Sequence, residues 1–183
     1  LSFKMYQKLK EKLDLDSLNP VESVVEKLRM IKDQSELEKI KKAVEIADQG
    51  FQFLLEFIEP GKTEKEVALE LEFFMKRKGG EKNAFDFIVA SGKRGALPHG
   101  VASNKKIETG ELVTIDFGTV YQGYHSDITR TIAVGEPAQK LKEIYEIVLK
   151  AQKKVIAEIK AGMSSVETDK IARDIIAEAG YKE

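Results

Sequence analysis

An internal repeat with a spacing of 101 residues constrains the fold of this chain more than any other feature of its sequence. When the sequence is shifted by this distance, a helix–stop–helix pattern recurs without a gap. The stop signal E-P-G-K-T at residues 59–63 becomes K-A-G-M-S at residues 160–164. The apolar positions that superimpose are Ile40 and Leu141, Ala47 and Val148, Leu54 and Val155, Ile58 and Ile159, and Phe74 and Ile175. Such patterns can look alike by chance, but the ungapped register favours two copies of one helix pair.

Local signals predict where these helices begin and end. S/T-x-x-E capping boxes start at Ser35, Thr63 and Ser164, each with a glutamate three residues later. Glycines that follow the apolar runs, at Gly79 and Gly180, are typical helix ends. The first helix is expected to present one apolar face, comprising Leu37, Ile40, Val44, Ala47, Phe51, Leu54 and Ile58.

The segment between the two helix pairs has the pattern of β-strands. Residues 85–90, 112–117 and 127–134 are short runs rich in Val, Ile, Phe and Thr. Because side chains alternate along a strand, one face of the last two runs is apolar and the other carries threonines and one aspartate each. The sequence therefore predicts an α+β fold, with an antiparallel sheet and helices packed on one of its faces.

The repeat also predicts the domain organisation. Strands follow the first helix pair, but the sequence ends three residues after Gly180, so we expect the second set of strands to be missing from it. Residues 1–28 combine a short helix near residues 4–13, a polar stretch at 14–20 and a strand-like run at 23–28. This is too little to fold alone. We expect residues 1–28 to be the C-terminal remnant of a preceding domain plus a linker, and residues 29–183 to be an incomplete domain that lacks its second set of strands.

Two aspartates on the polar sheet face suggest a metal site. If the strands turn at Tyr121-Gln122, Asp116 lies directly opposite Asp127, with Cβ atoms about 5 Å apart. Two carboxylates at that distance repel by roughly 3 kcal/mol at an effective dielectric constant near 20. Either one is protonated or a cation lies between them. Two unrelated turn residues are the alternative that the spacing leaves open.

Composition excludes several classes of protein. The chain has no cysteine, which excludes disulfides and zinc–thiolate sites. A net charge of -1 offers no general attraction to nucleic acid. Charges interrupt every apolar run, as Glu56 does between residues 51 and 58, so no membrane span or membrane partner is expected. These features predict a cytoplasmic protein.

Residues 84–135 resemble the pita-bread metallopeptidases, and within them the Xaa-Pro dipeptidase (prolidase) and Xaa-Pro aminopeptidase branch. The most specific parts are A-L-P-H-G at residues 96–100, D-F-G at 116–118 and S-D-I-T-R-T at 126–131. The similarity extends over residues 29–183, including L-R-M-I-K-D at 28–33. It implies the creatinase/aminopeptidase-like pita-bread fold, with two similar halves, of which this chain carries the first part.

The resemblance also implies a site. Two divalent metal ions, Mn or Co by expectation and Zn as a possibility, are held in that family by five side chains. Asp116 and Asp127 match two of these ligands, Asp127 as the one that bridges both ions. A water between the metals attacks the peptide carbonyl. His99 matches the histidine that stabilises the tetrahedral intermediate, Thr129 could support the carboxylates, and Phe85 is either a weak substrate contact or a core residue.

One departure from the family is serious. The segment G-H-G-x-G-H and both glutamate segments that complete the metal site are absent. We therefore expect a chain truncated at both ends and inactive alone. The full-length parent is expected to be a homodimer that cleaves Xaa-Pro dipeptides or peptide N-termini; the sequence does not decide between the two. The alternatives are a non-catalytic binding module and a metal-free hydrolase of the creatinase type.

Overall fold

The computed structural model describes residues 2–13 and 21–181. It divides into two compact units, Leu1–Glu38 and Lys39–Glu183, which are considered separately. The polar stretch expected at residues 14–20 lies outside the described residues. No helix in the described ranges is both long and apolar enough to cross a membrane.

The N-terminal unit is helical where it is described. It contains α1 (Phe3–Leu13), as predicted, and α2 (Val24–Met30), neither of which buries a residue. The strand expected at residues 23–28 is therefore wrong. Two adjacent valines suggested it, but the Glu, Lys, Leu, Arg and Met that follow are strong helix formers and determine the local structure. The proposed domain boundary at residue 28 stays a prediction.

Helix α3 (Gln34–Phe57) begins earlier than the Ser35 capping box predicted. The backbone N–H of Glu36 donates to Oδ1 of Asp33 at 2.9 Å, and that of Asp33 donates to Oε2 of Glu36 at 2.7 Å. This reciprocal pair is a capping box built on Asp33. Aspartate caps a helix as well as serine does, so the earlier D-x-x-E signal determines the start.

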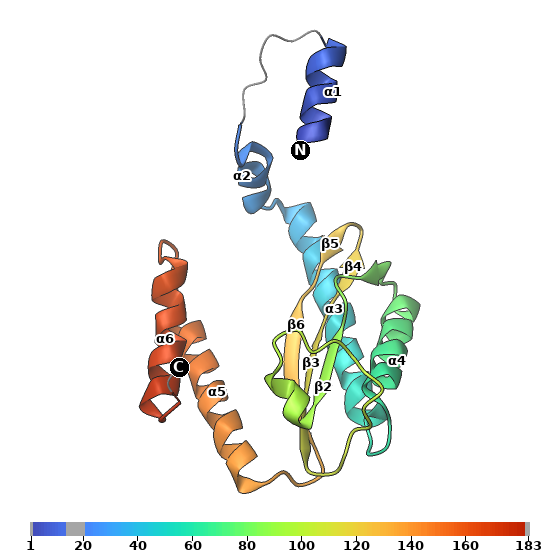
Figure 1. The fold of residues 1–183 in the computed structure, drawn as a ribbon, viewed down its shortest axis with the longest axis vertical. Helices are drawn as coiled ribbons and strands as arrows, with labels where there is room; N and C mark the ends of the chain where they lie inside the picture. The colour runs from blue at the N-terminus through green and yellow to red at the C-terminus, as the bar shows by residue number, and fades with distance from the viewer. Residues whose placement is uncertain (1, 14–20, 182–183) are drawn as a thin grey trace. The chain divides into compact units, whose positions relative to one another are not determined.

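The next elements form the layered body of the second unit (Figure 1). Helix α4 (Glu64–Arg77) has the predicted Thr63–Glu66 capping box. One antiparallel sheet has the order β2-β3-β6, from Ile88–Ser91, Glu111–Phe117 and Ile128–Val134. A smaller antiparallel sheet has the order β1-β4-β5, from Lys82–Asn83, Thr119–Tyr121 and Tyr124–His125. The 3-10 helix η1 (Gly92–Ala96) follows β2 directly.

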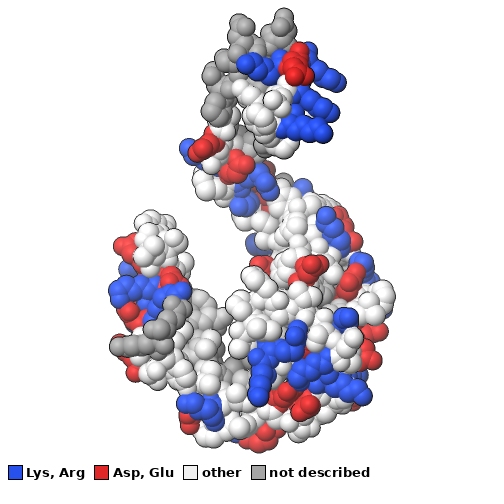
Figure 2. Space-filling model, in the orientation of Figure 1, with Lys and Arg blue, Asp and Glu red and all other residues white. Residues whose placement is uncertain are grey.

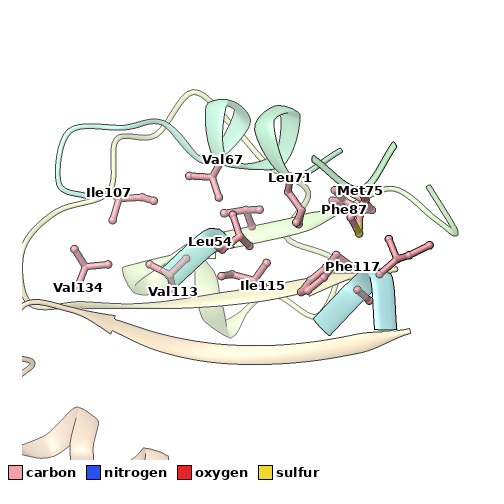
Figure 3. Close-up of a cluster of buried hydrophobic side chains, with 13 residues drawn as sticks. Leu54, Val67, Leu71, Met75, Phe87, Ile107, Val113, Ile115, Phe117 and Val134 are labelled. Carbon is pink, nitrogen blue, oxygen red and sulfur yellow. The ribbon is translucent and has the colours of Figure 1, made fainter. Parts of the chain in front are cut away.

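Helices α3 and α4 pack on one face of the β2-β3-β6 sheet, as predicted. Figure 3 shows their side chains directed at the apolar side chains of β3. Val113, Ile115 and Phe117 are fully buried there, which confirms the alternation along β3. The face predicted for α3 is partly wrong, because Val44 is 42% exposed while Ile46 and Gly50 are buried. The core cluster from the helices comprises Ile46, Ala47, Leu54, Val67, Leu71 and Met75.

The second helix pair reproduces the first in register. Helix α5 (Gln139–Glu158) ends 101 residues after α3, and α6 (Ser165–Glu178) matches α4 at both ends with the same shift. Ser164 and Glu167 form the predicted capping box. The glycines after the helices repeat as well, with Gly61 and Gly162 at φ 96° and 93°. The structure thus confirms the repeat.

Candidate metal centre

Asp116 lies on β3 and Asp127 directly precedes the adjacent antiparallel strand β6, but the register differs from the prediction. Asp116 pairs with Thr129 rather than Asp127. The chain turns at Gln122-Gly123, one position later than predicted, with φ values of 47° and 79°. Two consecutive positive φ values are required by a type I′ hairpin turn, and glycine adopts the second at little cost. Moving the turn by one residue shifts the register by two.

This shift keeps the two aspartates on the same face as diagonal neighbours, because side chains alternate with a period of two. The side chain of Asp116 is near enough to act on that of Asp127. Partial desolvation raises the pKa of Asp127, and the charge of Asp116 and the hydrogen bond between the two groups raise it further. The two aspartates are therefore neighbours, as predicted, but the prediction that they lie directly opposite each other was wrong. A carboxyl group whose ionised form is disfavoured by a neighbouring acid can be stabilised in that form by a bound cation.

Threonines on the same polar face support Asp116. The hydroxyl of Thr129 donates a hydrogen bond of 2.9 Å to Oδ1 of Asp116. Next along the strands, Thr114 and Thr131 face each other with hydroxyl oxygens 3.3 Å apart. Thr129 therefore fixes the direction of one carboxylate, which is how residues behind a metal ligand commonly act.

His99 lies in the loop that follows η1, in a turn, and its side chain is exposed. The carbonyl of His99 accepts a hydrogen bond of 2.8 Å from the N–H of Val101. Val101 in turn forms an antiparallel bridge with Ile88, and Ile88 pairs with Asp116. The backbone at Val101 is thus two strand spacings, about 10 Å, from that of Asp116. The topology brings the His99 loop to the sheet edge nearest this aspartate.

The sequence suggested that Phe85 opens a strand, but in the structure it does not. It is half-buried in a bend between β1 and β2, and β2 begins only at Ile88. Phe87, two residues later, is the aromatic side chain that enters the core, 5% exposed. The second histidine, His125, is exposed on β5.

The donor set suits a divalent cation but is incomplete. Two carboxylates on an open sheet face are ligands typical of hard or borderline divalent ions. Among the described residues, no group of three or more His, Cys, Asp or Glu side chains is arranged to hold a metal. Asp116 and Asp127 therefore fit part of a metal site by their chemistry.

One buried charge was missed by the sequence reasoning. Glu64, the first residue of α4, is fully buried and accepts hydrogen bonds from Ser91 and Ser103. Those partners are 27 and 39 positions away, so no local pattern distinguishes Glu64 from an ordinary first-turn acid. The nearby Thr63–Glu66 capping box predicts the start of α4 but not the burial of Glu64.

These features define a class: a helix-covered antiparallel sheet whose open face carries paired carboxylates, beside a histidine loop, within a duplicated helix framework. The chain belongs to metallopeptidase family M24, whose model matches residues 38–183. Its fold is the pita-bread fold of the solved prolidases and Xaa-Pro aminopeptidases.

Three relatives illustrate the similarity. A curated Xaa-Pro dipeptidase of Pyrococcus furiosus is 52% identical over 181 residues, which is 99% of this chain and 52% of that protein. The structure of an Xaa-Pro dipeptidase from Bacillus anthracis has a TM-score of 0.94 at 55% identity, covering 99% of this chain and 51% of the other. An X-Pro aminopeptidase from Thermotoga maritima has a TM-score of 0.91 at 42% identity, covering 99% and 51%. The chain thus spans about half the length of the relatives it matches.

Proposed function

We propose that the protein containing this chain is a metal-dependent peptidase that hydrolyses Xaa-Pro bonds. The observation that carries the proposal is the pair of neighbouring carboxyl groups of Asp116 and Asp127 on the open sheet face, in a chain similar throughout to Xaa-Pro peptidases. The substrate is an Xaa-Pro dipeptide or a peptide N-terminus with proline in second position. Proteins of both kinds are among the relatives, so the choice between them is left to experiment.

In this proposal Asp116 and Asp127 hold two divalent ions, Mn or Co by expectation. When bound, such ions lower the pKa of a water molecule and so supply a nucleophile near neutral pH. Thr129 keeps Asp116 oriented toward the ions through its 2.9 Å hydrogen bond. Because Asp127 is exposed and Asp116 half-buried, the site is open to substrate from the polar side of the sheet.

His99 supplies a hydrogen-bond donor. Placed in an exposed loop beside the sheet edge, its imidazole can approach the carbonyl oxygen of a bound peptide. A donor aimed at that oxygen stabilises the negative charge that develops when the carbonyl becomes tetrahedral. Phe85, half-buried before β2, is proposed as a weak apolar contact for the substrate.

The test is metal analysis combined with a hydrolysis assay on the intact protein. We expect hydrolysis of Ala-Pro or of Ala-Pro-Ala by the manganese- or cobalt-loaded protein, and the preferred peptide separates dipeptidase from aminopeptidase. Asp127→Asn should lower bound metal and abolish turnover, whereas Asp48→Asn, an exposed aspartate on α3, should change neither. Unchanged metal stoichiometry in Asp127→Asn contradicts the bridging role. Residues 1–183 alone, which lack three of the five family ligands, should be inactive.

A further inference from the structure

A buried carboxylate clamps both ends of the loop that carries His99. Glu64 is fully buried at the start of α4. Its Oε1 accepts hydrogen bonds from the N–H and hydroxyl of Ser91, at 2.8 and 3.0 Å. Its Oε2 accepts from the N–H and hydroxyl of Ser103, at 3.0 and 2.6 Å. Ser91 ends β2 and Ser103 lies beyond His99, so one side chain ties together the two ends of residues 91–103.

Arg94 ties the same carboxylate to the middle of the loop. Its Nε donates to both oxygens of Glu64, at 3.2 and 3.0 Å. Its terminal NH2 nitrogen donates to the carbonyl of Val101 at 2.7 Å. Val101 is two residues from His99 and bridges β2, so Arg94 connects the buried charge to the backbone next to the histidine.

Backbone contacts leave this loop little freedom. Gly100 is buried in a turn whose N–H donates to the carbonyl of Leu97 at 3.2 Å. A Cβ on Gly100 would lie 3.1 Å from Cβ of Ala90 and 3.3 Å from the carbonyl oxygen of Arg94, so the turn is pressed against β2. The loop therefore has one packed arrangement, and the links from Glu64 and Arg94 maintain it.

The hydrogen bonds that Glu64 accepts from the loop favour its ionised form. Burial by itself raises the pKa of this carboxyl, but the hydrogen bonds from Ser103 and Ser91 together outweigh it and lower the pKa. A carboxylate in this setting is stabilised by several donors at once, and a neutral substitute cannot accept from all of them. The loop ends thus depend on a charge, and not merely on the shape of the side chain.

We propose that Glu64, acting through Arg94, is a positioning residue that keeps His99 at a fixed position relative to the sheet face that carries Asp116 and Asp127. This role rests on the proposed peptidase function of that face. The physical reason is the demand of catalysis: a donor displaced by about 1 Å can lose on the order of a hundredfold in rate. A loop fastened only at an exposed turn would not hold His99 to that tolerance.

The first test measures the loop itself in the intact protein, by amide hydrogen exchange. In Glu64→Gln we expect exchange of the peptide covering residues 92–103 to accelerate at least tenfold, because its anchoring acceptors are weakened. Exchange in the middle of α4, at Leu71, should stay slow. Glu66→Gln is the matched control, since Glu66 lies two residues away and its carboxylate accepts hydrogen bonds from Thr63 of the capping box. Unchanged exchange at 92–103 in Glu64→Gln overturns the clamp.

The second test is a double-mutant cycle on Xaa-Pro hydrolysis. We expect Glu64→Gln to reduce kcat by about tenfold to a hundredfold, and to have no further effect in a protein that already carries His99→Ala. Equal losses with and without His99 overturn the positioning role, because a structural defect alone would add to the loss from His99→Ala. If Glu64→Gln does not fold, Arg94→Gln, at a side chain 30% exposed, tests the same link by the same cycle.

The two proposals fail separately. An intact, metal-loaded wild-type protein that cleaves no Xaa-Pro peptide refutes the proposed function, and hydrogen exchange in residues 92–103 then decides alone whether Glu64 clamps the loop. Normal hydrolysis with additive losses in the cycle keeps the function and refutes the positioning role.

Discussion

Replacing Asp127 by asparagine should stabilise the metal-free protein while weakening the metal-loaded one. Asp116 and Asp127 are neighbouring acids on one sheet face, and Asp127 has a raised pKa. A raised pKa in the folded state means that the group's favourable contribution is present below the usual value of 3.8 and is lost as the pH rises through the raised pKa. Above that pKa the negative charge of Asp116 repels the ionised form of Asp127. Asparagine removes that repulsion and keeps a donor toward Asp116.

The size of the gain follows from the solvent exposure of the pair. For charges roughly 6 Å apart at an effective dielectric constant near 60, which represents strong solvent screening, Coulomb's law gives at most about 0.9 kcal/mol. At pH 3 Asp127 is protonated in both folded and unfolded protein, so the gain should disappear. Added Mn²⁺ should reverse the order, because only wild type gains the full free energy of binding.

Urea unfolding of EDTA-treated protein, at pH 7 and pH 3 and with and without Mn²⁺, measures these differences. Asp48→Asn on α3 should change the free energy of unfolding by less than about 0.5 kcal/mol at either pH. The reasoning is refuted if Asp127→Asn destabilises the metal-free protein at pH 7, or if its gain is as large at pH 3.

Three further outcomes are expected. Leu54→Ala should cost about 2–5 kcal/mol of unfolding free energy in urea titrations, because Leu54 is fully buried. Leu55→Ala, at a neighbouring residue that is 48% exposed, should cost less than about 0.5 kcal/mol. Gly118→Ala should unfold the protein or cost more than about 2 kcal/mol by the same assay, since its Cβ would overlap the carbonyl oxygen of Ser126. Hydrogen bonds from Ser164 hold the pKa of Glu167 below its usual value, so Glu167→Gln should speed amide exchange in α6 at pH 7, with the difference from wild type vanishing as the pH falls through that lowered pKa.

Features fixed by near neighbours were predictable from the sequence. The capping boxes at Thr63 and Ser164 and the positive-φ glycines involve residues only a few positions apart, and the structure has all of them. The alternation of β3 was predictable because burial of one sheet face imposes a period of two. The repeat was visible because both copies retain these local signals.

Features that depend on distant or competing residues were less predictable. The sequence allows a turn at Tyr121-Gln122 as well as the observed turn at Gln122-Gly123. These two turns give registers that differ by two residues, and the alternation of side chains is the same in both. Asp33 competed with Ser35 as a helix cap, and both satisfy the same chemistry. The burial of Glu64 was invisible because it depends on donors brought together only by the fold.

The repeat separates what a duplicated segment inherits from what it must acquire. Helices α4 and α6 share both of their ends because each end is encoded within a few residues, and such information travels with the segment. The position equivalent to Glu64 is Ser165, which is exposed. A buried charge is tolerated only where partners from elsewhere in the chain surround it. A buried acid at this position is therefore not encoded by the helix segment alone. The matching helix starts therefore place a buried, hydrogen-bonded acid in one copy and an exposed serine in the other.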